Sequence, residues 1–206
     1  MALSGLKRLE TQTVRKINGR IGEIQQRIWQ PKMQIADVAI AETMDHLSLA
    51  QAKRLSYKAM KGDTRWGKEW STAWFRLRLT VPREFKGEKV ALLFKPEGEC
   101  IIFRNGLPVQ GLDRNRDDYL LFKKAKGGEK VELYVEAGAS NAFGGFTTRT
   151  ALMPSVAVVN DDVWKAYHDL VALYGMIDPK LSASGWASGA DSYALESHDP
   201  WRAKII

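Results

Sequence analysis

Glu97 and Glu99 are the carboxylates whose spacing comes nearest to a catalytic pair. Glycosidases use two carboxylic acids, and these lie on either side of the bond that is cleaved. Side chains two residues apart on a strand share one face of the sheet, so these two carboxylates would not flank a scissile bond. We therefore interpret Glu97 and Glu99 as structural residues.

The remaining chemically active side chains do not form a recognisable site. His46, His168 and His198 lie far apart, and none has a second metal ligand at the usual spacing. The only cysteine, Cys100, excludes an internal disulfide framework and a cysteine-based zinc cluster, and its apolar surroundings indicate a buried thiol. No phosphate-binding glycine loop and no G-x-S-x-G elbow occur. The sequence predicts that this chain holds neither catalytic residues nor a metal.

Aromatic side chains are the alternative source of function, because they can stack on sugar rings. Trp66, Trp70 and Trp74 fall in one block, residues 65–82. Such a cluster forms a packed corner of a core or an interface more often than a flat surface for a sugar, but the sequence leaves both open. The segment NAFGGF, residues 141–146, is a second candidate surface, which either meets a partner or folds back over its own core. The candidate carbohydrate-binding or domain-interface residues are Trp66, Trp70, Trp74, Asn105, Gly106, Asn141, Phe143 and Gly144.

Period-two alternation predicts the strands that would position these residues. After Trp74, the side chains alternate between apolar and polar up to Val81, which is typical of a half-buried strand. Asn105–Gly106 separates two apolar segments and predicts a type I′ hairpin turn. Short strands at near-regular spacing favour an antiparallel β-sandwich or jelly roll. The predicted strands are 33–40, 73–81, 88–95, 99–104, 107–112, 118–123, 130–137 and 155–160.

Apolar residues at helical spacing predict helices on both sides of these strands. One helix is expected over residues 5–30, where Pro31 would stop it, and a second over 47–60. A third is expected over 161–177, where Asn160 can cap the start. The small residues that follow the third helix are typical of a linker.

Composition sets limits on partners and location. The chain has 206 residues, 45% of them hydrophobic, which suffices for one core. Acidic side chains are interleaved with the basic ones that give the net charge of +7, so we predict no nucleic-acid binding. No apolar run is long enough to cross a membrane, no secretory signal is recognisable, and the single cysteine favours the cytoplasm.

Four segments in order resemble one protein family. They are WGKEWSTAWFRLRLTVP, GECIIFRNGLPVQGL, VELYVEAGASNAFG and VWKAYHDLVALYG. Together they resemble the N-terminal domain of the cytosolic and vacuolar-type α-mannosidases of glycoside hydrolase family 38. The resemblance covers about residues 60–177 and extends to the leading helix 5–30.

The resemblance implies a non-catalytic β-sandwich of the galactose-binding-like, jelly-roll type. In the family it precedes a zinc-dependent catalytic domain that cleaves α-mannosides with retention of configuration. The motif with His and Asp zinc ligands that opens that domain is absent here, because His198–Asp199 lacks its surroundings. The implied organisation is a helical extension over 1–60, a β-sandwich over 61–160, and a helix and linker over 161–206 that lead to the catalytic domain.

The expected function is therefore that of an accessory domain of an α-mannosidase. It would support the catalytic domain, the substrate entrance or a homo-oligomer of the full-length enzyme, with zinc only in the catalytic domain. Asn141, Phe143 and Gly144 would contact that domain. One alternative is a stand-alone carbohydrate-binding module that binds mannosides, and another is an oligomerisation module that acts through helix 5–30.

Overall fold

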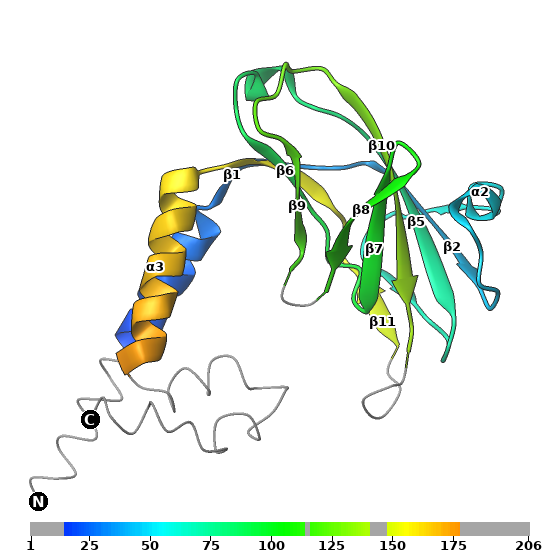
Figure 1. The fold of residues 1–206 in the computed structure, drawn as a ribbon, viewed down its shortest axis with the longest axis horizontal. Coiled ribbons are helices and arrows are strands. Elements are labelled where there is room, and N and C mark those ends of the chain that lie inside the picture. The colour runs from blue at the N-terminus through cyan, green and yellow to red at the C-terminus, as the bar shows by residue number, and fades with distance from the viewer. Residues whose placement is uncertain (1–14, 114–115, 141–147, 178–206) are drawn as a thin grey trace, which may run out of the picture. The chain divides into compact units, whose positions relative to one another are not determined.

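The computed structural model describes residues 15–113, 116–140 and 148–177, and within them the protein is mainly β (Figure 1). The four-stranded sheet has the order β1-β12-β6-β9, with β1 at Trp29–Gln34, β12 at Ser155–Val159, β6 at Val90–Leu93 and β9 at Asp118–Phe122. The six-stranded sheet has the order β3-β2-β5-β10-β7-β8, with β3 at Lys58–Ala59, β2 at Asp37–Thr43, β5 at Thr72–Thr80, β10 at Lys130–Gly138, β7 at Glu99–Arg104 and β8 at Leu107–Leu112. A short pair joins β4 (Thr64–Trp66) to β11 (Arg149–Ala151).

All strand pairs in the described ranges are antiparallel, and the two large sheets form a sandwich. The first and last strands of the sandwich are partners, since Trp29 of β1 faces Val159 of β12. A 3₁₀ turn at Arg83–Phe85 and the one-turn helix α2 (Leu49–Ala52) complete this part of the chain.

The hydrophobic core lies between the two sheets. The six-stranded sheet contributes one face of β5 and β10, and the four-stranded sheet contributes β6 and β12. Burying one such aliphatic or aromatic side chain contributes about 1.5–3 kcal/mol. The core side chains with no or almost no exposure include Phe75, Leu77, Leu133, Val135, Val90, Leu92 and Val156.

The strands predicted from residue 73 onward are confirmed, each with ends within two residues of the prediction. The predicted turn is confirmed as well, because Asn105 and Gly106 have φ angles of 54° and 85° between β7 and β8. The antiparallel sandwich expected from the alternation is therefore the observed fold.

The predicted helix 5–30 is wrong at its C-terminal end. Of its described residues, 15–26 are helical, and β1 already begins at Trp29. The helix ends four residues before Gln30, the residue at which Pro31 was expected to stop it. A proline has no N–H to donate, and it disfavours helical angles in the residue before it. The register between β1 and β12 shifts between Trp29 and Lys32, around this proline. The strands thus begin at Trp29, whereas the organisation that the resemblance implies starts the sandwich at residue 61.

The predicted helix 47–60 is also wrong, since α2 contains only four residues. Ser48 and Gln51 form a capping box at its start, but the chain then turns and pairs with β2 through β3. Backbone groups along the edge of β2 need partners, and Met60 donates its N–H to the Val38 carbonyl at 2.8 Å. The strand predicted at 33–40 covers the end of β1 and the first part of β2, with a break at residues 35 and 36 between them.

The chain forms two compact units, and Trp29–Val159 is the sandwich. In the other unit, helix α3 (Asp161–Ile177) begins and ends where the sequence predicts. Asn160 caps it, because its side-chain oxygen accepts a hydrogen bond from the Val163 N–H at 3.1 Å. This unit also holds the helix over residues 15–26 (Figure 1). None of the helices in the described ranges combines the length and apolarity needed to span a bilayer.

Candidate functional site

Trp66 lies inside the sandwich. It ends β4 and is only 2% exposed. Its Nε1 donates a hydrogen bond of 2.7 Å to the carbonyl oxygen of Pro96, and its ring packs edge-on against Phe75 at 5.8 Å between centroids. A buried indole with a satisfied N–H is a packing residue, so it offers no surface to a ligand.

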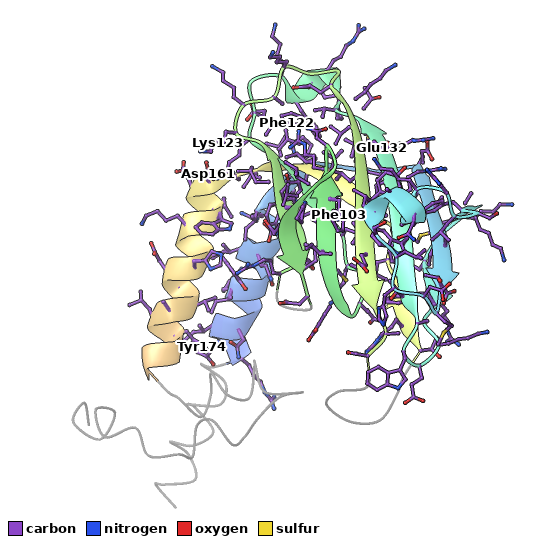
Figure 2. The ribbon with its side chains drawn as sticks, turned by 45° about the vertical axis from the view of Figure 1, so that its right-hand side comes forward. Phe103, Phe122, Lys123, Glu132, Asp161 and Tyr174 are labelled. Carbon is purple, nitrogen blue, oxygen red and sulfur yellow. The ribbon has the colours of Figure 1, made fainter. Side chains whose placement is uncertain are left out.

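Trp74 is fully buried on the outer face of the six-stranded sheet, away from the main core. Its ring lies 5.7 Å from that of Phe103, which Figure 2 labels on β7. The α2 segment covers this cluster, and Ala52 is completely buried within it. The apolar side chains that complete the cover are Leu47, Leu49, Leu55 and Tyr57.

Trp70, in contrast, is exposed to solvent over 60% of its surface. It lies in the turn before β5 with a φ of 65°, a backbone region that bulky side chains rarely adopt. Its N–H donates to the Ala139 carbonyl at 2.9 Å, which fixes the turn to the end of β10. Only one of the three indoles is exposed, so these tryptophans do not provide two exposed rings on which a sugar could stack.

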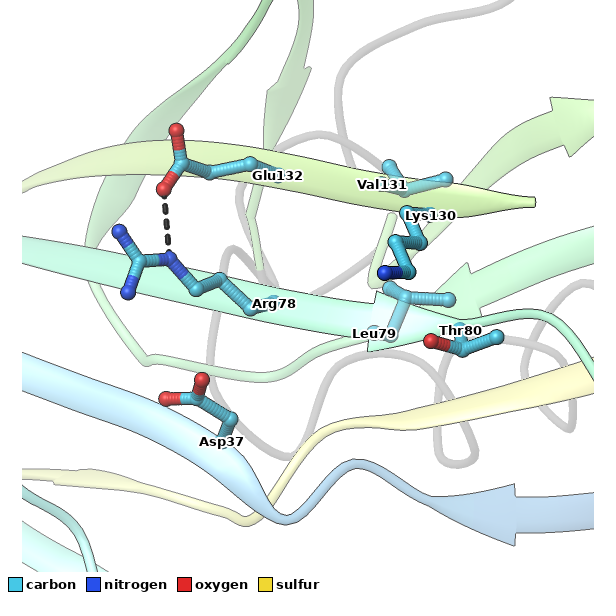
Figure 3. A pocket seen from close by; sticks show the side chains of 7 residues that line it. All are labelled: Asp37, Arg78, Leu79, Thr80, Lys130, Val131 and Glu132. Atoms are coloured by element: carbon cyan, nitrogen blue, oxygen red, sulfur yellow. Dashed lines mark hydrogen bonds and ion pairs between the residues drawn. The ribbon is translucent and has the colours of Figure 1, made fainter. Parts of the chain in front are cut away.

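Charged side chains form a row at one end of the same outer face. Asp37, Arg78 and Glu132 are cross-strand neighbours on β2, β5 and β10. Figure 3 shows the Arg78 guanidinium between the two carboxylates, and its Nε donates to Glu132 Oε1 at 2.7 Å. The hydrogen bond to Glu132 and its charge raise the pKa of Arg78. Both partners are exposed, so this ion pair contributes little to stability. The two side chains line a hollow of about 400 Å³.

A second hollow of about 310 Å³ opens where Gly138 ends β10. Thr72 of β5 and Glu99 of β7 are the cross-strand neighbours of Gly138, which has no side chain to fill the space between them. Glu136 precedes Gly138 on the same face of β10. Burial raises the pKa of the Glu136 carboxyl, while the neighbouring His46 lowers it. We call this hollow the Gly138 groove; its lining residues are Thr72, Glu99, Cys100, Ile101, Glu136 and Gly138.

The acidic residues around this end of the sandwich mainly hold backbone in place. Glu42 accepts a hydrogen bond of 2.9 Å from the Gly67 N–H, and Asp63 accepts one of 2.9 Å from the Met153 N–H. The Glu97 carboxylate accepts the N–H of Thr150. Glu97 is therefore a structural residue, as predicted.

The remaining predicted site residues fall at different places. Asn105 and Gly106 follow the end of β7 opposite to Glu99, so they lie away from the Gly138 groove. Asn141, Phe143 and Gly144 lie outside the described residues. Thr72, Glu136 and Gly138 were not predicted to lie together. The alternation in VELYVEAG was the available signal, because it places Glu132, Tyr134, Glu136 and Gly138 on one face.

In the described part of the chain, no three His, Cys, Asp or Glu side chains are placed to hold a metal ion. His168 packs against Trp164 in α3, with 4.1 Å between ring centroids. His198 lies outside the described residues.

Cys100 is half-buried beside the main core, and burial raises the pKa of its thiol to about 12. Because the thiolate is the reactive form, we expect the folded protein to react with a disulfide reagent near pH 8 at least about tenfold more slowly than the unfolded chain. The reaction can be followed with and without denaturant. The contribution of this thiol to stability is present below its unfolded pKa and is lost as the pH rises towards about 12. Equal reaction rates in the folded and unfolded protein would contradict the burial of the Cys100 thiol.

The strand order, the core and the buried indoles define an antiparallel β-sandwich whose tryptophans mainly serve its own packing. The family to which the chain belongs is described as "Alpha-mannosidase, jelly roll domain", and its model matches residues 31–168.

The chain is similar to two α-mannosidases and to one solved structure. Alpha-mannosidase G of Dictyostelium discoideum is 30% identical over 52% of this chain and 10% of its own length. Alpha-mannosidase 2C1 of Homo sapiens is 31% identical over 50% of this chain and 10% of its own length. Among solved structures, a β-glucuronidase from Ruminococcus gnavus matches 64% of this chain and 29% of its own with a TM-score of 0.45 and 10% identity. The chain thus spans about a tenth of the length of these curated relatives.

Proposed function

We propose that this chain acts as the non-catalytic N-terminal domain of an α-mannosidase. It would support a catalytic domain that carries the zinc ion, shape its substrate entrance or build its homo-oligomer. The observation that carries the proposal is the family membership of residues 31–168. A parent enzyme in the cytoplasm agrees with the single half-buried cysteine.

The placement of the side chains supports an accessory role over hydrolysis by this chain. Glu97 is occupied with a backbone N–H, and Glu42 and Asp63 are occupied in the same way. These carboxylates hold the segments around the end of the sandwich in a fixed arrangement, as a supporting surface requires.

A stand-alone module that binds sugars through the tryptophan cluster has less support. It needs an exposed pair of indoles, whereas Trp66 and Trp74 are buried and only Trp70 of the three faces solvent. The remaining alternative is an oligomerisation module that acts through the first helix. Light scattering of a chain without residues 1–26, which leaves β1 intact, tests it.

Association with the catalytic domain tests the proposal. The catalytic domain of the parent enzyme is produced separately, mixed with this chain and examined by size-exclusion chromatography. We expect a complex that Phe143→Ala weakens. The chain alone is expected to release no product from a nitrophenyl α-mannoside. The absence of any complex at high concentration, or hydrolysis by the chain alone, would overturn the proposal.

A further inference from the structure

We infer that the Gly138 groove, together with the exposed indole of Trp70, binds a neutral hexopyranoside. The proposal adds a ligand to the accessory role and rests on that role only for the choice of a mannoside as the probe. Four features of the described residues carry it: the shape of the groove, its hydrogen-bonding groups, its charge, and the exposed indole of Trp70, whose backbone is bonded to the residue after Gly138.

The shape follows from one residue in the sheet. Along the row Thr72–Gly138–Glu99, the middle strand presents no side chain, so the flanking side chains become walls and the backbone of β10 becomes the floor. The groove of about 310 Å³ falls at the lower end of the range of small-ligand sites. A Cβ built on Gly138 would have its nearest neighbour, the Glu99 carbonyl oxygen, at 3.8 Å, so the space is not needed for packing.

The walls carry hydrogen-bonding groups suited to hydroxyls. The carboxylates of Glu99 and Glu136 can accept hydrogen bonds from a sugar, and the Thr72 hydroxyl can donate or accept. Glu136 is half-buried, and burial raises its pKa. A ligand hydroxyl would replace the water that such a carboxylate loses on burial.

Trp70 supplies the apolar surface that sugar recognition also requires. Its backbone N–H is bonded to Ala139, the residue directly after the floor of the groove, and its side chain is 60% exposed. The φ of 65° keeps this large side chain in a sparsely populated conformation, and such conformations are concentrated at ligand-binding sites. Solvent exposure and an uncommon backbone conformation are independent of the carboxylates, and both agree with a ligand contact.

The charge of the groove selects among ligands. The two carboxylates would repel a phosphate or a uronic acid, while a neutral sugar can donate its hydroxyls to both. A small organic cation is the competing ligand class, because it could pair with the carboxylates and stack on the indole.

Titration of the isotope-labelled chain with methyl α-mannopyranoside tests the proposal by NMR. We expect saturable shifts of the backbone N–H of Gly138 and the indole N–H of Trp70, with a Kd in the millimolar range. Glucuronic acid and tetramethylammonium serve as charged probes and are expected to leave these signals unchanged.

Two pairs of variants separate the groove from the rest of the sheet. Gly138→Leu fills the groove and should abolish binding, whereas Gly62→Leu, outside the groove, should not, since a Cβ there meets nothing within 4 Å. Glu136→Gln should weaken binding about tenfold, whereas Glu132→Gln, on the same strand outside the groove, should leave it unchanged. The dispersion of each spectrum shows whether the variant is folded.

Several outcomes would overturn the inference. These are the absence of shifts at the highest soluble sugar concentration, shifts confined to another face, binding that persists in folded Gly138→Leu, and a preference for tetramethylammonium. None of them bears on association with the catalytic domain, so failure of the sugar site and failure of the accessory role remain distinguishable.

Discussion

Trp66→Ala is expected to lower the free energy of unfolding by about 3–5 kcal/mol, the range measured when large aromatic side chains are removed from cores. The indole is 2% exposed, packs edge-on against Phe75 and satisfies the Pro96 carbonyl through Nε1. Its loss leaves a cavity and also an acceptor without its partner, and both effects act in the same direction.

Trp70→Ala is the matched control, since it removes the same side chain from a site that is 60% exposed. Its effect on stability should stay within about 0.5 kcal/mol. Urea unfolding of both variants, followed by circular dichroism, gives the comparison. Equal losses in the two variants would mean that Trp66 is not the packing residue described above.

Gly98→Ala is the second substitution with a large expected effect, a loss of about 2–4 kcal/mol. Gly98 has a φ of 91°, which an L side chain adopts only under strain. A Cβ there would also lie 2.6 Å from the carbonyl oxygen of Gly138, a backbone atom of β10 that cannot move without disturbing the sheet. The backbone strain and the steric overlap therefore both lower the free energy of unfolding.

Gly128→Ala isolates the first of these two contributions. Gly128 has a similar φ of 89°, but a Cβ at that position would meet nothing within 4 Å. It should cost about 1 kcal/mol, the usual loss for a residue forced into the left-handed region. Thermal and urea unfolding of the two variants would reveal the difference. If Gly128→Ala proved as destabilising as Gly98→Ala, the close approach to β10 would not explain the effect.

Strands were predictable from the sequence wherever one face is buried and the other is polar. Burial alternates with the sequence pattern from Phe75 to Thr80 in β5 and over the first four residues of β10. The pattern does not show that Trp74 and Tyr134, on the outer face, are buried as well, because the α2 segment that covers them comes from elsewhere in the chain. The Asn105–Gly106 turn was predictable because few residues adopt positive φ without cost.

Short strands and interrupted helices were not predictable in this way. The pair β4–β11 has three residues on each side, too few for a period to be recognised. β3 forms because the edge of β2 needs backbone partners, a tertiary requirement that overrides the helical spacing of residues 47–60. β1 replaces the end of the first predicted helix because β12 pairs with it, although the two are far apart in the sequence.

The candidate site was only partly predictable for a related reason. The sequence identifies Trp70 as a member of an aromatic cluster, but only the fold shows that it is exposed while Trp66 and Trp74 are not. The Gly138 groove depends on cross-strand register, which brings Thr72 and Glu99 to either side of one glycine. Register between strands is not encoded in the spacing of residues along one strand.

The pairing of Trp29 with Val159 has a consequence for the modularity of this protein. Because the chain enters and leaves the sandwich on adjacent strands, those two points are only about 5 Å apart. A body with such neighbouring ends can be spliced into a loop of a host protein, or joined end to end and reopened elsewhere as a circular permutant, without stretching either side. Of the two strands, β1 lies at the edge of its sheet and pairs only with β12, so detaching β12 would release β1, whereas β12 would still pair with β6 if β1 were detached.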